Sequence, residues 1–318
     1  MSSDSELAAR LRDRDLSAAP AVLNLVENRS AARRAEIAAL LHGVSPAALG
    51  GEAPGHVVGI TGPPGAGKST LLSALVAEWR ARGRSVAVLA VDPSSKRTGG
   101  ALLGDRARIV HDPEDRGVFI RSTAAGTRLG GLAPSTRAAA TALAAAFDVV
   151  VIETVGVGQS ETEVAEVADT VAVIVQPGSG DALQFLKSGI MEVPDVLVVT
   201  KADLGVVAQR ARRDLTAALR SLGARDTPVV AVSSVAPVSG VDALVDALDA
   251  HRAGLDLAAR RVAARRAGAL ADFVAERGDA GLRAVGGRRA GLRLLAEQDP
   301  AADIPTLLSV LESQADAR

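Results

Sequence analysis

Short apolar runs alternate with longer amphipathic segments from residue 56 to about residue 240. The apolar runs predict strands at 56–61, 85–91, 117–121, 148–153, 170–176, 195–200 and 228–233. The segments between them predict helices near 69–82, 134–146, 161–168, 181–191 and 206–222. Strands that alternate with helices are typical of a parallel sheet, because each crossover returns the chain to the same edge. We therefore expect an α/β fold with a mostly parallel central sheet and helices on both faces.

The two ends of the chain lack this alternation. Residues 1 to about 41 place apolar positions at helical spacing, and 42–55 are rich in Gly and Pro, as in a linker. After about residue 241, segments rich in Ala, Arg and Leu predict helices up to the C-terminus. We predict three parts: a helical extension with its linker at 1–52, the α/β domain at 53–250, and a helical region at 251–318.

Composition excludes several classes of protein. The 318 residues are 48% hydrophobic with net charge -1, which is typical of a globular chain with a sizeable core. The absence of cysteine excludes disulfides and thiolate metal sites, and the four histidines lack ligand spacing. Only one Trp and four Phe are present, which argues against a surface that stacks nucleic-acid bases. A charged N-terminus without a long apolar run predicts a cytoplasmic protein, with neither membrane nor nucleic acid as a partner.

Residues 62–69 carry the most specific motif. They read Gly-Pro-Pro-Gly-Ala-Gly-Lys-Ser, a complete G-x-x-x-x-G-K-[ST] phosphate-binding loop between a predicted strand and a predicted helix. The glycines let backbone N–H groups face the phosphates, Lys68 reaches the β- and γ-oxygens, and the Ser69 hydroxyl ligates Mg²⁺. The predicted nucleotide contacts are Gly62, Pro63, Pro64, Gly65, Ala66, Gly67, Lys68, Ser69 and Thr70. The loop predicts the P-loop NTPase fold.

Lysine is rare in this chain. Only Lys68, Lys96, Lys187 and Lys201 are lysines among 36 basic residues, and the rest are arginines. A compact ammonium suits a phosphate cradle that the wide fork of arginine does not fit. We therefore assign Lys68 to catalysis and Lys201 to the base, and we expect Lys96 and Lys187 to lie in switch segments.

Magnesium needs further oxygen ligands. Asp92 and Glu153 end apolar strands, where a carboxylate without a partner is costly, and Asp105 lies on a Gly-rich segment. Each is a candidate Mg²⁺ ligand beside Ser69, and a helix or turn cap is the alternative role. Glu153 and Gly156 occupy the slot of the D-x-x-G switch of GTPases, where the Gly156 N–H contacts the γ-phosphate.

Residues 200–203 read Thr-Lys-Ala-Asp and follow a predicted strand. A carboxylate at Asp203 accepts from both N1–H and the N2 amino group of guanine, which adenine cannot satisfy. Thr200 replaces the usual Asn, so we expect weaker binding but the same base preference. The loop at Ser233, Ser234 and Val235 is expected to present a backbone N–H to guanine O6. The predicted nucleotide is GTP.

The water-positioning Gln of Ras-like enzymes is missing from its usual place. Val157 follows Gly156, and Gln159 lies two residues further along the chain. Gln159 serves hydrolysis only if its loop rearranges. Slow intrinsic turnover, accelerated by a partner, is expected.

Three further segments (92–100, 103–106 and 153–161) together resemble the methylmalonyl-CoA mutase-associated GTPases, the MeaB/ArgK/MMAA group, in the metallocentre-assembly branch of P-loop GTPases. Residues 178–192, with Gln184 and Lys187, resemble the third switch of that family, although Phe185 and Ser188 depart from its pattern. The resemblance implies a homodimeric GTPase chaperone that gates adenosylcobalamin loading and protects a B12-dependent acyl-CoA mutase. It implies GTP or GDP with Mg²⁺ as ligands and no directly bound cobalamin. It also implies Asp92, Asp105 and Glu153 in the hydrolysis machinery, dimerisation through 251–318, and the mutase's adenosyltransferase as a further partner.

Alternatives remain open at this point. The mutase served is methylmalonyl-CoA mutase or a related isobutyryl- or ethylmalonyl-CoA mutase, and a P-loop kinase is the alternative of another class. A nickel-handling GTPase would need a His tract or a Cys motif, which the sequence lacks. Residues 251–293 hold ten arginines against four acids, which predicts a solvated helix face or a docking surface.

Overall fold

The computed structural model describes residues 3–28, 30–92, 109–124, 132–154, 163–178 and 194–317. The chain divides into two compact units. The helical unit comprises Met1–Gly55, Pro134–Phe147 and Asp256–Arg318, and the sheet unit comprises His56–Ala133 and Asp148–Leu255. The functional division into an extension, a GTPase domain and a dimerisation region stays a prediction.

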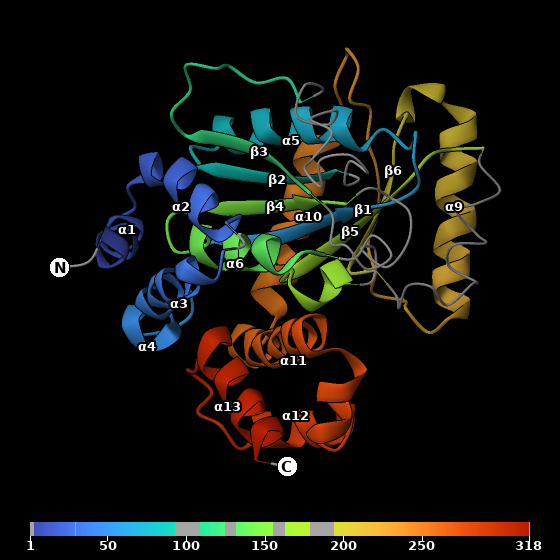
Figure 1. Ribbon diagram of the computed structural model, residues 1–318. Coiled ribbons are helices and arrows are strands. Elements are labelled where there is room, and N and C mark those ends of the chain that lie inside the picture. The colour runs from blue at the N-terminus through green and yellow to red at the C-terminus, as the bar shows by residue number, and fades with distance from the viewer. Residues whose placement is uncertain are drawn as a thin grey trace. The chain divides into compact units, whose positions relative to one another are not determined.

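Seven parallel strands form the centre of the sheet unit (Figure 1). They are β1 (His56–Thr61), β2 (Val86–Asp92), β3 (Val118–Ala124), β4 (Val149–Glu153), β5 (Thr170–Val175), β6 (Val196–Val199) and β7 (Val229–Ala231). Their order in the sheet is β3-β2-β4-β1-β5-β6-β7. The predicted α/β class and all seven predicted strands are confirmed, because apolar runs buried on both faces are typical of parallel strands.

Helices cover the strands on opposite sides within this unit. The helices α5 (Lys68–Ala81) and α10 (Val241–Gly254) pack with Val58 and Ile60 of β1 into one apolar core. On the other side of β1, a Cβ atom at Gly59 would lie only 2.7 Å from Val164 in the 3₁₀ turn η4 (Val164–Glu166). Helix α9 (Val206–Ser221) packs on β6 and β7.

In the described part of the predicted helix at 161–168, Glu163 is α-helical and Val164–Glu166 form the 3₁₀ turn η4, while residues 161 and 162 lie outside the described residues. Asp169 accepts a hydrogen bond from Val57 N at 2.9 Å, immediately before β5 begins.

A chain of hydrogen-bonding side chains links the amino ends of β1 and β5 with α10. His56 Nε2 lies 2.8 Å from Thr170 Oγ1, which lies 2.9 Å from His251 Nδ1. His251 Nε2 lies 3.1 Å from Asp195 Oδ1. The Asp195 carboxylate accepts from His251 Nε2, and the tautomers of the two histidines set the direction of the bonds to the Thr170 hydroxyl, which can both donate and accept.

Replacing Thr170 by valine keeps the shape but removes the hydroxyl. The buried His56 Nε2 then loses its hydrogen-bond partner, so we expect the free energy of unfolding to fall by about 1–3 kcal/mol. Denaturant unfolding measures the change. Thr216→Val is the matched control, because that hydroxyl bonds only to Arg212 O of its own helix, at 2.8 Å. Equal midpoints for both variants would contradict a structural role of the chain.

The helical unit is built from the two ends of the chain and one central helix. Its N-terminal elements are α1 (Ser3–Arg12), η1 (Leu16–Ala18), α2 (Ala19–Val26), η2 (Ala31–Arg33), α3 (Arg34–Gly43) and α4 (Pro46–Leu49). The others are α6 (Pro134–Leu143), α11 (Leu257–Ala284), α12 (Arg288–Ala296) and α13 (Ile304–Asp316). Leu270, Phe273 and Leu311 are among the residues that form an apolar core between α11, α12 and α13. The predicted helical termini are confirmed, although α4 interrupts the predicted linker.

A buried ion pair joins α6 to α11 inside this unit. Arg137 donates to the Asp272 carboxylate, and both residues are at least nine-tenths buried. Burial raises the pKa of the Asp272 carboxyl, and the Arg137 guanidinium opposes that rise. Removal of Arg137 would leave a buried carboxylate without its cation, which is costly. The pair therefore favours the packing of α6 on α11 that keeps the two side chains together.

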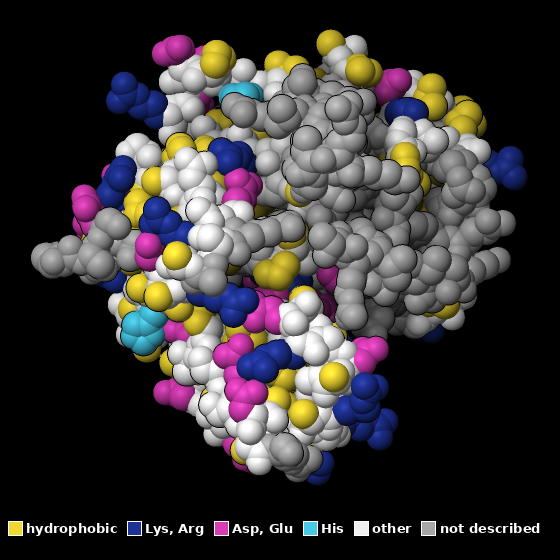
Figure 2. Space-filling view, in the orientation of Figure 1, with side chains coloured by type: hydrophobic (Ala, Val, Ile, Leu, Met, Phe, Trp, Pro, Cys, Tyr) yellow, Lys and Arg dark blue, Asp and Glu magenta, His cyan; other side chains and the backbone are white. Residues whose placement is uncertain are grey.

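Two arginines of the C-terminal cluster are buried, which corrects the expectation of a solvated face for them. Arg261 donates to Ala53 O at 2.5 Å and Gly55 O at 2.6 Å, and Arg265 forms a two-pronged contact with Glu52 at 2.8 and 2.9 Å. The face of the helical unit seen in Figure 2 mixes basic with acidic side chains. Arg261 and Arg265 therefore hold the segment that leads into β1.

No helix in the described part of the chain is both long and apolar enough to cross a membrane.

Candidate functional site

The phosphate-binding loop connects β1 to α5 at the carboxyl edge of the sheet. Gly62 has φ 143° and approaches β5 so closely that a Cβ atom would lie 2.1 Å from Ile174 O. Gly65 and Gly67 have φ 77° and 92°, and Gly67 is the N-cap of α5. Residues other than glycine rarely adopt these backbone conformations. The backbone thus places the loop at the positive end of the α5 dipole, where anions bind.

Lys68 is folded into this loop. Its Nζ donates to Gly62 O at 2.8 Å and lies 3.3 Å from Pro63 O, and the residue is 8% exposed. The carbonyl groups of the loop thus hold the ammonium beside the glycine-rich backbone. A phosphate cradled by the loop would meet a positive charge that is already in place.

Ser69, Glu153 and Asp92 lie on the same side of the sheet. The Ser69 hydroxyl donates to Glu153 Oε1 at 3.1 Å, although 84 positions separate the two residues. Asp92 ends the neighbouring strand β2, two residues beyond Ala90, which is in register with Glu153. Side chains alternate along a strand, so Ala90, Asp92 and Glu153 face the side that packs against α5. Both acids are almost fully buried.

This oxygen set fits Mg²⁺. A hydroxyl and two carboxylates are ligands that a hard cation prefers, and Mg²⁺ needs few protein ligands because phosphate and water supply the others. Among the residues that the structure describes, no three His, Cys, Asp or Glu side chains cluster as a complete metal cage. Ser69, Asp92 and Glu153 leave coordination positions of Mg²⁺ to nucleotide phosphates and water, which suits a cation that arrives with its nucleotide. The magnesium roles of Ser69, Asp92 and Glu153 stay a prediction.

Removal of either carboxylate charge should impair turnover that depends on Mg²⁺. For Glu153→Gln and Asp92→Asn, which preserve side-chain size, we expect GTP hydrolysis to fall about 10–100-fold at limiting Mg²⁺. Hydrolysis measured across a Mg²⁺ titration checks this. Asp112→Asn is the control, because Asp112 only caps a turn through Glu114 N at 2.9 Å. Wild-type rates in both acid variants would make the two carboxylates structural.

Thr200 joins the phosphate loop to the base loop. It is 3% exposed, and its hydroxyl lies 2.7 Å from Ala66 O and 3.1 Å from Val175 O. The sequence predicts weaker nucleotide binding because Thr200 stands where an Asn usually contacts the base. The structure instead shows its hydroxyl as a donor to the backbone, a contact made across 134 positions.

The predicted base-reading residues come together after β6 and β7. Asp203 is exposed in the 3₁₀ turn η5 (Ala202–Leu204), and Ser233 Oγ lies 3.3 Å from Asp203 Oδ1. Lys201 adopts φ 52° and donates to Gln176 Oε1 at 2.6 Å. Ser234 is half-buried and Val235 is exposed beyond Ser233. An accessible carboxylate held by a serine hydroxyl can accept two N–H groups of a guanine edge.

Two residues of this edge were not among the predicted site residues. Gln176 directly follows β5 and is the hydrogen-bond partner of Lys201. Thr154 Oγ1 lies 2.9 Å from Thr61 Oγ1, next to Glu153 and the phosphate loop. Their position directly at strand ends was the available signal. The remaining predicted residues (Lys96, Asp105, Gly156, Gln159, Gln184 and Lys187) lie outside the described residues.

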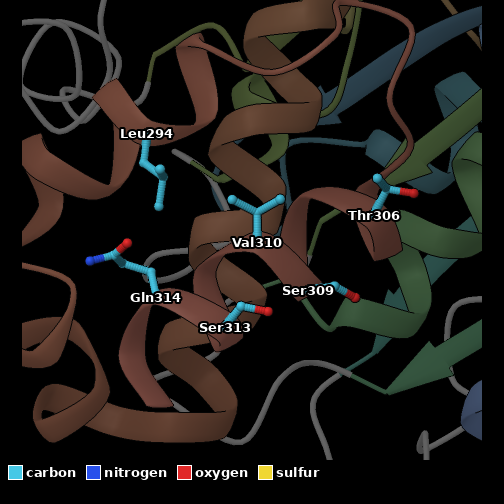
Figure 3. Close-up of a pocket in the computed structure, with 6 residues that line it drawn as sticks. All are labelled: Leu294, Thr306, Ser309, Val310, Ser313 and Gln314. Carbon is cyan, nitrogen blue, oxygen red and sulfur yellow. The ribbon is translucent and has the colours of Figure 1, made fainter. Parts of the chain in front are cut away.

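A groove in the helical unit is not part of this site (Figure 3). It has a volume of about 590 Å³ and is lined by Leu294, Thr306, Ser309, Val310, Ser313 and Gln314. Five of these residues follow one face of α13, and Leu294 faces them from α12. None of the six carries a charge or titrates, so the groove offers nothing for phosphate chemistry.

Comparison with known proteins places the chain in a family. The family "Methylmalonyl Co-A mutase-associated GTPase MeaB" matches residues 19–280. A protein of Pyrococcus abyssi named as a GTPase is 42% identical over 268 residues, which cover 82% of this chain and 80% of that protein. A Mycobacterium tuberculosis protein, also named as a GTPase, is 41% identical over 266 residues, or 82% of this chain and 78% of that protein.

Two further relatives extend the comparison. The mitochondrial methylmalonic aciduria type A homologue of Mus musculus is 42% identical over 171 residues, which cover 53% of this chain and 41% of that protein. The crystal structure of an LAO/AO transport system kinase superposes with a TM-score of 0.64 at 29% identity, covering 92% of this chain and 96% of that one. This chain belongs to the methylmalonyl-CoA mutase-associated GTPase family MeaB, and it is a GTPase that binds guanine nucleotides.

Proposed function

We propose that this GTPase controls the loading of adenosylcobalamin into a B12-dependent acyl-CoA mutase, with methylmalonyl-CoA mutase as its main partner, and protects that enzyme. The match of residues 19–280 to a family described by its association with that mutase carries the proposal. A related isobutyryl- or ethylmalonyl-CoA mutase is the alternative client. The adenosyltransferase of the mutase is a further partner in the same proposal.

Within this function, each residue at the carboxyl edge of the sheet has a separate role. Lys68 compensates charge on the β- and γ-phosphates, while the glycine-rich backbone orients them. Ser69, Glu153 and Asp92 hold the Mg²⁺ that accompanies the nucleotide. Bound Mg²⁺ neutralises developing charge on the phosphate oxygens. Asp203 selects guanine, and Thr200 keeps the phosphate loop and the base loop at a fixed separation.

We also propose that the protein acts as a homodimer through its C-terminal helices. The uncharged groove on α12 and α13 supports this, because a helix face that carries no charge suits close packing against another helix. Sedimentation of the intact protein at several concentrations tests it. A monomer at all concentrations would contradict the proposal.

Partner-dependent hydrolysis is the main test. We expect purified protein to release phosphate slowly, and reconstituted mutase to raise the rate about tenfold, which is a barrier lowered by roughly 1.4 kcal/mol. Following the γ-phosphate label distinguishes hydrolysis from transfer to another acceptor, as a kinase would perform. A mutase that leaves the hydrolysis rate and the delivery of adenosylcobalamin unchanged would contradict the proposed function.

A further inference from the structure

One face of α9 forms a basic groove outside the nucleotide site. The groove has a volume of about 670 Å³ and is lined by Gln209, Arg212, Arg213, Thr216, Ala217 and Arg220. These positions recur every three or four residues, so they share one face of the helix. The three arginines are exposed, and no acidic side chain is among the lining residues. Figure 1 shows α9 standing beside β6.

The arginines of this groove have no carboxylate partner among the described residues. Arg212 donates to the backbone at Val229 O, 3.1 Å away, and Arg213 contacts only Gln209 O, at 3.4 Å. The single acid of α9 is Asp214, which lies 3.8 Å from Arg210 and outside the groove. Other arginines of the sheet unit, such as Arg80 and Arg84, are paired with aspartates at 2.7 Å. Three unpaired positive charges along one face favour an anionic occupant.

We propose that this α9 groove docks an acidic helical segment of a partner protein. Arg212 and Arg213 lie about two helical turns from Arg220, and carboxylates spaced by three or four residues on an opposing helix match that repeat. Thr216 and Ala217 are small and lie between the charges, which lets an opposing helix approach closely. The inference rests on the proposed function, because it takes the mutase complex as the partner that docks on α9.

The groove is also placed to influence the nucleotide. Helix α9 begins at Val206, and only Gly205 separates it from η5, the turn that carries Asp203. Gly205 has φ 60° and ψ -113°, so the chain changes direction between the turn and the helix. A partner held on α9 is therefore attached to the base-reading loop through a single residue.

A defined peptide probe tests the groove directly. The probe is a fluorescent helical peptide with glutamates at every third or fourth position, and its counterpart carries glutamine at those positions. We expect the glutamate peptide to bind the full-length protein, more weakly at higher ionic strength, and Arg213→Glu with Arg220→Glu to weaken binding about tenfold or more. Arg210→Glu is the control, because it reverses one positive charge on the same helix outside the groove. Its effect should stay within about threefold.

Several outcomes would overturn the proposal. If the glutamine peptide binds as tightly as the glutamate peptide, the three arginines do not select acidic partners. If Arg210→Glu weakens peptide binding as much as the double variant does, the effect is not specific to the groove. A single-stranded oligonucleotide that binds the groove more tightly than the acidic peptide would assign the surface to nucleic acid instead. Arg213→Gln with Arg220→Gln repeats the test if the reversed charges disturb folding, which thermal unfolding reports.

The mutase provides the second measurement. The charge-reversed double variant should keep the basal hydrolysis rate and lose most of its acceleration by mutase, because neither arginine belongs to the nucleotide site. If mutase does not accelerate hydrolysis even by the wild-type protein, the proposed function fails. The peptide assay still tests, independently, whether the α9 groove binds an acidic helix. Full acceleration of the double variant would overturn the α9 groove as the docking surface.

Discussion

Lys68→Ala should lower GTP hydrolysis about a thousandfold and weaken nucleotide binding. Loss of one preorganised charge that faces a developing anion costs about 10²–10³ in kcat, and Lys68 is the cation that the loop carbonyls hold at 2.8 and 3.3 Å. Single-turnover phosphate release gives the rate, and a fluorescent GTP analogue gives the affinity. The expected loss of hydrolysis rate is large because the ammonium is buried inside the loop rather than exposed to water.

Two further variants sharpen this result. Lys68→Arg keeps the charge but should not restore the rate, because a planar guanidinium does not reproduce the compact ammonium that Gly62 O and Pro63 O hold. Arg210→Ala removes an exposed positive charge that faces Asp214 and should leave hydrolysis unchanged. A Lys68→Ala rate within tenfold of the wild type would show that the loop cradles phosphate without needing its lysine.

Asp203→Asn should turn a guanine preference into a xanthine preference. An amide at this position cannot accept from both N–H groups of guanine, and it can donate to the 2-oxo group that xanthine carries instead. Loss of two charge-assisted hydrogen bonds costs about 3–5 kcal/mol, so GTP affinity should fall roughly 10²–10⁴-fold. Ser233, whose hydroxyl lies 3.3 Å from Asp203 Oδ1, should hold the substituted side chain in the same place.

Competition among GTP, xanthosine triphosphate and ATP measures that change. The wild type should prefer GTP over ATP by far more than tenfold, and the variant should bind xanthosine triphosphate best. Asp214→Asn, an acid on the following helix, controls for the loss of charge. ATP binding within tenfold of GTP in the wild type would contradict Asp203 as the base-reading residue.

The strands and the phosphate loop were predictable because their signals are local. Each parallel strand is an apolar run a few residues long, and the loop motif lies between a strand and a helix that are its neighbours in sequence. Lys68 and Ser69 follow from the same stretch. The convergence of Asp92, Glu153 and Thr200 on one edge also followed, because parallel strands place their carboxyl ends together.

Contacts between distant segments depended on the tertiary structure. The order β4-β1-β5-β6 brings the Ser69 hydroxyl to Glu153 and the Thr200 hydroxyl to Ala66, pairs that lie 84 and 134 positions apart. Arg261 reaches Gly55 across 206 positions, although the arginine cluster looked like a solvated face in the sequence. Hydrophobic periodicity reports which side of an element is buried, whereas strand order and helix packing determine which side chain it meets there. The sequence therefore determined the nucleotide loop and its edge of the sheet, and the tertiary structure decided the partners that hold Thr200, Glu153 and the buried arginines.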